Sequence, residues 1–160
     1  GFNGGVKIQG HKAIATLNSF MYKMDLMDPD IIIVGSQSGT APDANYHLDY
    51  FNLAQYEFLL GTQPDAVVLC VSGYQYNESI IRSVQFIQSA TRAVVIALVL
   101  FPLIRKMEVV SNLRRFRPLE KSEREQICAR FSSGTALPCY DLASTEDIDT
   151  LFSQIIDYYA

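Results

Sequence analysis

The sequence is poor in cysteine. Its 160 residues contain three, and no two of them have the CxxC spacing of a zinc or redox motif. Three scattered cysteines are also too few for the disulfide framework of a small secreted domain. We therefore expect Cys70, Cys128 and Cys139 to be buried thiols, because free cysteine is among the most frequently buried residue types.

The sequence also lacks an apolar run long enough to span a membrane. Its most apolar stretch, residues 93–104, is shorter than the roughly 20 residues that a membrane helix needs, and Pro102 interrupts it. Residues 1–5, GFNGG, have neither the basic start nor the apolar core of a signal peptide, so we expect a cloning remnant or a linker there. These features predict a cytoplasmic chain that does not contact a membrane.

Excess positive charge is absent, since the formal net charge is −4. This balance argues against general nucleic-acid binding. Between residues 105 and 117 the local charge is positive, because Glu108 is the only acidic residue there. The basic residues of this segment are Arg105, Lys106, Arg114, Arg115 and Arg117. The segment predicts a positive patch that could attract a negative ligand or an acidic peptide.

Catalytic and metal-binding signatures are missing as well. The two histidines, His11 and His47, have no further ligands at the spacing of a metal site. We interpret His11 as a residue at the start of a helix and His47 as a surface residue. No GxSxG motif places a nucleophilic serine, so the sequence predicts no catalytic residue and no metal site.

Two kinds of apolar pattern alternate along the chain: continuous apolar runs, which are typical of buried strands, and apolar residues at helical spacing. Continuous apolar or β-branched runs predict strands at 6–9, 31–34, 65–71, 93–101 and 137–142. Helical spacing predicts helices at 11–27, 46–60, from 77 onwards, 122–131 and 148–159. The last helix has the clearest stripe, formed by Ile148, Leu151, Phe152, Ile155, Ile156 and Tyr159.

Local signals predict where these helices begin and end. Pro29 closes the first helix, and Gly61 stands where a left-handed terminator of the second is usual. Asn77 can cap the third helix. Ser122 and Glu125 have the spacing of a capping box for the fourth.

Strands that alternate with helices imply right-handed crossovers and a parallel sheet. With 49% hydrophobic residues, the chain can bury one core. We therefore expect a single α/β domain over residues 6–160, built as a three-layer sandwich around a mainly parallel sheet.

Ligands of open α/β sheets bind at the carboxyl ends of the strands. The loops expected at that edge are 36–45, 72–77 and the segment from Phe101, with 9–12 as a fourth. Aromatic residues are frequent there, namely Tyr46, Tyr50, Tyr56, Tyr74 and Tyr76. The candidate ligand-binding residues are Ser36, Gln37, Ser38, Gly39, Thr40, Ser72, Gly73, Tyr74, Arg105 and Lys106.

The string GSQSGTA at 35–41 is similar to the phosphate loop of flavodoxins and diflavin reductases. That resemblance implies FMN as a cofactor, with hydroxyls from Ser36, Ser38 and Thr40 on its phosphate and Tyr74 or Tyr76 stacked on its ring. Two features differ, because the flavodoxin loop follows the first strand and leads directly into a helix. Here a strand and a helix are expected before the loop, and Pro42 follows it.

Three longer segments carry a different resemblance: GVKIQGHKAIATLNSF, PDIIIVGSQSG and LLGTQPDAVVLCV. They resemble the carboxyl-terminal half of the DUF1611 family, P-loop proteins related to dethiobiotin synthetase. They are also similar to clostridial peptide maturation system proteins, which occur beside radical SAM peptide maturases. The similarity extends roughly from Gly5 to Pro102, and it implies a P-loop NTPase-like, Rossmann-like fold.

The sequence departs from the P-loop pattern at two points. The 160 residues contain no GxxxxGK[ST], so the Walker A lysine and serine are absent. Gly35 stands where the relatives have an acidic residue that helps to hold the metal. Both departures predict a chain that does not hydrolyse nucleotides by itself.

The resemblance therefore implies an accessory, non-catalytic domain of a peptide maturation protein in natural-product biosynthesis. Such a domain would bind a peptide or a nucleotide-like anion, and its partners would be a precursor peptide or other maturation proteins. The alternatives from another class are an FMN-binding redox domain and one half of an NTP-dependent ligase.

Overall fold

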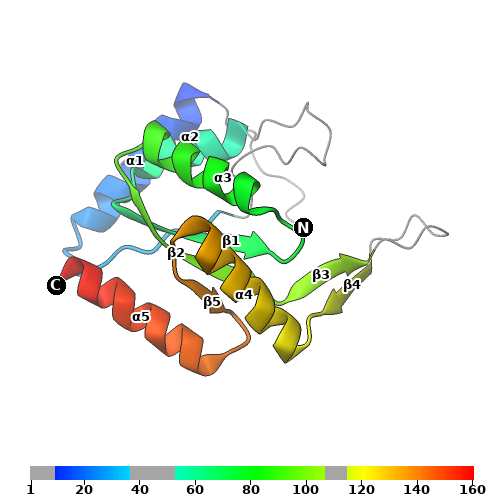
Figure 1. Ribbon diagram of the computed structural model, residues 1–160. Helices are drawn as coiled ribbons and strands as arrows, with labels where there is room; N and C mark the ends of the chain where they lie inside the picture. Colours follow the sequence, from blue (N-terminus) through cyan, green and yellow to red (C-terminus); the bar gives the residue numbers. More distant parts are fainter. Residues whose placement is uncertain (1–9, 37–52, 107–114) are drawn as a thin grey trace. The chain divides into compact units, whose positions relative to one another are not determined.

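The computed structural model describes residues 10–36, 53–106 and 115–160 of the chain (Figure 1). The chain divides into two compact units. The first comprises residues 1–65 and 85–94, and the second comprises residues 66–84 and 95–160. The single domain expected over residues 6–160 stays a prediction, and the strand expected at 6–9 lies outside the described residues.

Two helices, α1 (His11–Asp25) and α2 (Leu53–Thr62), pack against each other in the first unit. They approach most closely at Gly61, where a Cβ would lie 2.6 Å from the Cβ of Leu17. Gly61 lies inside α2, so its prediction as a left-handed terminator was wrong. The residue with positive φ is Gln63 (φ 44°), which follows the helix. Close helix packing, and not a turn, therefore explains this glycine.

The apolar run at 31–34 is not a strand. Residues 31–36 belong to no strand and pair with none of the strands in the described ranges, and the side chain of Ile33 is 78% exposed. β-branched residues favour an extended backbone, but a strand forms only where a neighbour completes the hydrogen-bond ladder. The prediction of a buried parallel strand was wrong because composition does not specify that neighbour.

Three strands form the sheet of the second unit in the order β1 (Ala66–Ser72), β2 (Val94–Phe101), β5 (Cys139–Asp141). Strand β2 runs parallel to β5, with Leu98 opposite Cys139 and Leu100 opposite Asp141. As the central strand, β2 is buried along residues 95–100, in agreement with its apolar sequence. The strands predicted at 65–71, 93–101 and 137–142 are confirmed.

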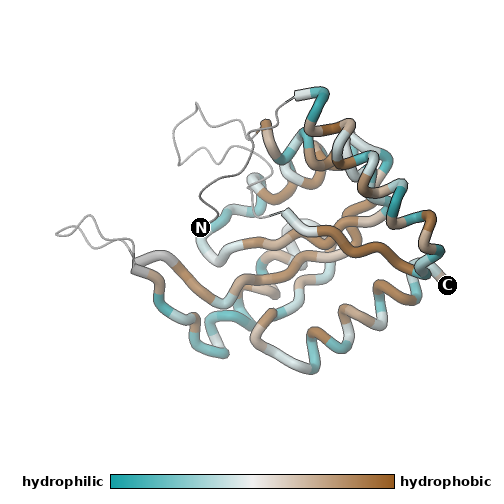
Figure 2. Tube along the Cα trace, turned by 180° about the vertical axis from the view of Figure 1, so that it is seen from behind, coloured by the Kyte–Doolittle hydropathy of each residue, from teal (hydrophilic) through white to brown (hydrophobic). Residues whose placement is uncertain are grey.

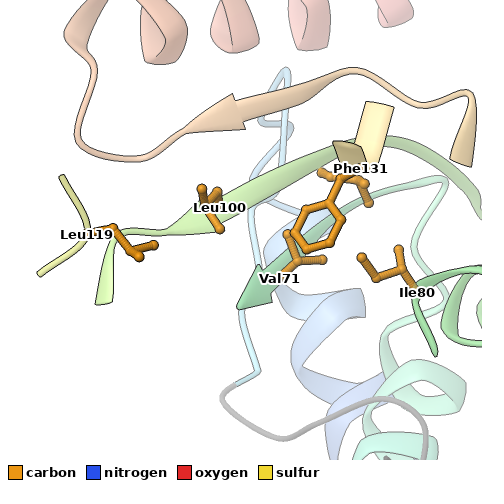
Figure 3. Close-up of a cluster of buried hydrophobic side chains, with 6 residues drawn as sticks. Val71, Ile80, Leu100, Leu119 and Phe131 are labelled. Atoms are coloured by element: carbon orange, nitrogen blue, oxygen red, sulfur yellow. The ribbon is translucent and has the colours of Figure 1, made fainter. Parts of the chain in front are cut away.

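Helices cover both faces of this sheet. They are α3 (Asn77–Ala90), α4 (Lys121–Thr135) and α5 (Thr145–Tyr159). Leu100 of β2 belongs to a buried cluster with Ile80 of α3 and Phe131 of α4 (Figure 3). Its neighbour Val99 packs in a second cluster with Leu151 of α5. Because successive side chains of a strand point to opposite faces, the two clusters lie on opposite sides of the sheet. The three-layer α/β architecture is confirmed.

The segment after β2 is a β-hairpin where the sequence predicted a loop. Strands β3 (Leu103–Lys106) and β4 (Arg115–Pro118) pair antiparallel, with Ile104 opposite Arg117 and Arg105 opposite Phe116. Charged residues weaken the period-two pattern by which a strand is recognised. A two-stranded ribbon accepts them because it is not buried on both faces.

The N-cap of helix α4 lies two residues earlier than predicted. Its N-cap is Glu120, whose backbone N–H donates to a carboxylate oxygen of Glu123 at 2.9 Å. The prediction placed the cap at Ser122. A reciprocal contact between positions N-cap and N3 is present, but it uses Glu120 and Glu123 in place of Ser122 and Glu125.

Asn77 is the first residue of α3 and does not cap it. The carbonyl that accepts the first helical hydrogen bonds, from Ser79 and Ile80, is that of Tyr76. The side-chain amide of Asn77 instead donates to the carbonyl of Arg130 in α4, at 3.4 Å. The predicted cap was wrong because a tertiary contact takes the side chain away from its own helix end.

Helix α5 confirms the predicted stripe, and Figure 2 shows the helix that ends at the C-terminus alternating between hydrophobic and hydrophilic colours. Only part of the stripe contacts the sheet: Leu151 is buried and Ile155 packs beside it, while Phe152 and Ile156 are each 54% exposed. Within the described ranges, no helix combines the length and the apolar character needed to cross a membrane.

Candidate functional site

The predicted ligand-binding residues fall into three groups. Ser36 lies in the first unit, whereas Ser72, Gly73 and Tyr74 lie in the second. The backbones of Arg105 and Lys106 are part of β3 in the second unit. Residues 37–40 lie outside the described residues, as does His47. A pocket assembled from all three groups therefore stays a prediction.

Ser36 is engaged within the first unit. Its hydroxyl donates a hydrogen bond to the side-chain oxygen of Gln55, a residue of α2 that is buried. This contact connects the segment after 31–34 to α2. The bond uses the hydroxyl proton that the FMN interpretation assigned to a phosphate.

The amino end of α1 is closed by a carboxylate of its own unit. Gly10 precedes the helix with φ 65°, and its N–H donates to Oε1 of Glu57 at 2.6 Å. Glu57 belongs to α2 and is buried. Unpaired N–H groups at a helix start attract anions, and here a side chain supplies the negative charge. His11 is exposed beside it, as expected for a residue at a helix start.

The loop after β1 is held by side chains from two sides. The N–H of Ser72 donates to Oε1 of Gln75 at 2.7 Å, and the N–H of Gln75 donates back to the carbonyl of Ser72 at 3.0 Å. Arg130 of α4 donates from Nη2 to the carbonyls of Gly73 and Gln75, at 3.1 and 3.3 Å. Four hydrogen bonds therefore fix a turn of only a few residues.

Gly73 brings this turn against the core. A Cβ at this position would lie 3.0 Å from Cδ1 of Ile127 and 3.3 Å from Cδ1 of Leu119. The backbone at Gly73 packs against the core, whereas the two tyrosines that follow it are exposed: Tyr74 is 45% exposed and Tyr76 is 61% exposed. The turn presents two aromatic rings on a rigid base.

One further exposed aromatic side chain lies at the same edge of the sheet, and another lies in the hairpin that follows β2. Phe101 ends β2, the strand next to β1, and is 45% exposed. Phe116 lies in the hairpin that follows β2 and is 59% exposed. Because the strands are parallel, the end of β1 at Ser72 and the end of β2 belong to one edge. Exposed aromatic rings of this kind anchor peptides and flat ligands.

Of the predicted tyrosines, Tyr74 and Tyr76 lie at this edge. Tyr56 belongs to the first unit, where its ring lies 5.7 Å from that of Phe86. Tyr46 and Tyr50 lie outside the described residues. The sequence therefore placed Tyr74 and Tyr76 at the correct edge of the sheet, whereas it assigned Tyr56 to that edge and the structure packs it against Phe86.

The arginines described near the edge are already paired. Arg117 holds Glu123 through two hydrogen bonds of 2.7 and 2.6 Å, which lower the pKa of the Glu123 carboxyl to about 2. Arg124 binds Asp141 at 2.6 Å where both side chains are largely buried. The positive charge expected from Arg105 and Lys106 stays a prediction, since their side chains lie outside the described part.

Two features of the second unit have no motif in the sequence. Arg130 and Gln75 hold the turn, yet 55 residues separate them. Cys128 and Cys139 lie with their sulfur atoms 3.4 Å apart. The prediction of three buried thiols was wrong, because Cys70 is exposed and the other two are only partly buried.

No group of three or more metal-ligating side chains occurs among the residues that the structure describes.

One comparison with known proteins gives a match. The family model described as "Domain of unknown function (DUF1611_C) P-loop domain" matches residues 10–152. No curated protein matches the chain. No solved structure matches it either.

Proposed function

Because the chain belongs to the DUF1611 family, as its C-terminal P-loop domain, we propose that it is a binding domain without bond-breaking chemistry of its own. It binds a peptide or a nucleotide-like anion at the carboxyl edge of β1 and β2. In this proposal it is the accessory part of a peptide maturation protein, and the peptide is the precursor that the system modifies.

The observation that carries the proposal is the rigid turn after β1. Arg130 and Gln75 hold its backbone with hydrogen bonds between 2.7 and 3.3 Å, while Tyr74 and Tyr76 remain exposed. A preorganised aromatic surface binds more tightly than a mobile one, since less conformational entropy is lost on binding. The position of the turn agrees with the general rule that α/β sheets bind ligands at the carboxyl ends of their strands.

Two observations favour binding over catalysis. The 160 residues contain no GxxxxGK[ST], the motif whose lysine and hydroxyl hold a triphosphate and its magnesium. In addition, the N–H of Gly10 at the start of α1 donates to Glu57 and is not available to a phosphate. A nucleotide that binds this chain would therefore be bound and released without hydrolysis.

The proposal is tested by calorimetric titration of the whole chain with a synthetic precursor peptide from the same gene cluster and, separately, with ATP and GDP. We expect one of these probes to bind. In the double variant Tyr74→Ala, Tyr76→Ala the affinity should fall about tenfold or more, which corresponds to about 1.4 kcal/mol. The matched control is Tyr22→Ala, an equally exposed tyrosine on α1 of the first unit, which should leave the affinity unchanged.

Each other outcome counts against the proposal. If titration with each probe gives no heat of binding, the proposed binding function is wrong. Equal loss of affinity in the Tyr22 variant would locate the site away from the turn. Release of phosphate from ATP would contradict the absence of catalysis, and a yellow protein that takes up FMN would favour the redox alternative.

A further inference from the structure

The second unit contains a pair of neighbouring thiols that no sequence motif predicts. Cys128 lies on α4 and Cys139 on β5, and the two Sγ atoms are 3.4 Å apart. Both side chains are partly buried and pack against the cluster around Phe131. Their separation exceeds the ~2.05 Å of a disulfide by little more than about 1 Å, a distance that side-chain rotation can close.

The two thiols are not equivalent. Cys139 donates the hydrogen bond and Cys128 accepts it, so the interaction lowers the pKa of Cys128 and raises that of Cys139. The negative charges of Asp141 and Asp147 raise the pKa of both thiols, while the positive charge of Arg124 lowers the pKa of Cys128. The thiolate is the reactive form of cysteine. Cys128 is therefore the attacking sulfur of the pair, and Cys139 is placed to react with whatever forms on it.

We propose that Cys128 and Cys139 form a redox-reactive dithiol site whose substrate is a hydroperoxide. The Cys128 thiolate attacks the terminal peroxide oxygen, the O–O bond breaks, and Cys128 becomes a sulfenic acid while the peroxide is reduced to an alcohol or water. The sulfur of Cys139 then attacks Cys128, the S–O bond breaks, and hydroxide leaves with the Cys139 proton as water. Two electrons pass from the two sulfurs to the peroxide. An external dithiol reverses the bridge by exchange.

The positions of the sulfurs allow a disulfide to form between elements that are already in place. The bridge joins α4 to β5 across 11 residues and connects two elements that already pack together, so it requires no rearrangement of the sheet. It also forms next to the ion pair of Arg124 with Asp141 at the end of β5. Oxidation therefore links two elements of the second unit covalently and leaves the pattern of hydrogen bonds around them in place.

The test uses the whole chain treated with a small excess of hydrogen peroxide, followed by iodoacetamide and trypsin. Arg130 lies between the two cysteines, so trypsin separates a peptide of residues 125–130 from one of residues 131–160. We expect a cross-linked pair of these peptides, lighter than their sum by two hydrogen atoms, which dithiothreitol separates. Cys70 is exposed and serves as the internal control, because it should be recovered as the alkylated thiol.

Single substitutions test the order of the steps. In Cys139→Ser, Cys128 should accumulate as a sulfenic acid that dimedone traps. In Cys128→Ser, peroxide should convert Cys139 to a sulfenic acid, trapped by dimedone, at least tenfold more slowly. Circular dichroism verifies that both variants are folded, and the cross-link in the unaltered chain does not depend on them.

The proposal is overturned if both cysteines are recovered alkylated at a peroxide dose that oxidises free cysteine completely. It is also overturned if Cys128 proceeds to sulfinic acid without forming the cross-link, or if Cys70 forms the bridge instead. Equal trapping in the two variants would contradict the assignment of Cys128 as the attacking sulfur.

Discussion

Asn77 of α3 occupies the space that a side chain at position 134 of α4 would need. A Cβ on Gly134 would lie 1.8 Å from Nδ2 of Asn77 and 3.1 Å from its Cβ. The two helices can approach here only because residue 134 has no side chain. This glycine has no turn to make, since it lies inside α4.

Gly134→Ala should therefore destabilise the chain although alanine is the better helix former. Helix propensity favours alanine by about 0.8–1.0 kcal/mol, and overpacking at a tight contact costs about 1–3 kcal/mol. We expect a net loss of about 1 kcal/mol in urea unfolding. In an Asn77→Ala background the same substitution should be neutral or stabilising, and stabilisation with Asn77 intact would contradict the contact.

The contact between Gly61 and Leu17 gives a second prediction. Gly61→Ala would place a Cβ 2.6 Å from the Cβ of Leu17, which cannot move without its backbone, so we expect a loss of about 1–3 kcal/mol. Gly35→Ala is the matched control, because no atom lies within 4 Å of a Cβ there and its effect should stay within about 0.5 kcal/mol. Thermal unfolding of both variants decides, and equal midpoints would disprove the tight α1–α2 approach.

The ion pair between Arg124 and Asp141 should stabilise the end of β5. The two side chains are only 17% and 11% exposed, and Arg124 also donates to the carbonyl of Leu119 at 2.5 Å. Arg124→Ala leaves the carboxylate of Asp141 buried without its partner, which should cost about 3–5 kcal/mol.

The exposed pair of Lys121 with Glu125 provides the control for this loss. Its side chains are 83% and 64% exposed and 3.8 Å apart, so Lys121→Ala should change the stability by less than about 0.5 kcal/mol. Chemical denaturation of both variants at one pH measures the difference. Similar losses in the two variants would show that burial of the Arg124 pair contributes nothing.

The pair of Arg117 with Glu123 predicts a dependence on acid. The hydrogen bonds from Arg117 lower the pKa of Glu123 from 4.5 to about 2. Since the folded-state pKa is depressed, the stabilisation is complete above about pH 4.5 and is lost as the pH falls toward 2. Proton uptake by Glu123 should therefore accompany the acid end of the unfolding curve.

Arg117→Gln should move the titration midpoint of Glu123 upward, toward the ordinary range of a glutamate, as followed by NMR of its carboxyl carbon. Arg92→Gln replaces an exposed arginine of the first unit and should leave the midpoint unchanged. A midpoint of Glu123 that is the same with and without Arg117 would refute the assigned cause.

Much of the fold was accessible from periodicity. The run at 93–101 predicted the central strand, and the stripe around Leu151 predicted α5, because both patterns reflect burial of one local segment. The run at 31–34 has the same composition as a strand but forms none. Side chains indicate that a segment can be extended, whereas pairing depends on a second segment elsewhere in the chain.

In the candidate site, too, local position could be predicted from the sequence, whereas contacts between distant residues could not. Ser72, Gly73 and Tyr74 could be assigned to the carboxyl edge of the sheet, because a loop after a buried parallel strand has a known position. Arg130 could not, since its role requires α4 to return to the loop after β1. The charges assigned to the segment 105–117 were predicted as a patch, yet Arg117 is paired with Glu123.

The sequence by itself determined the central strand at 93–101, the helix around Leu151 and the α/β class of the fold, because these properties depend on patterns within one segment. Tertiary structure alone decided which residues meet: Gly134 with Asn77, Arg130 with the turn, and Cys128 with Cys139. These contacts join residues 11 to 57 positions apart. Local pattern carries no information about such pairs, since their distance is fixed only when the elements between them pack.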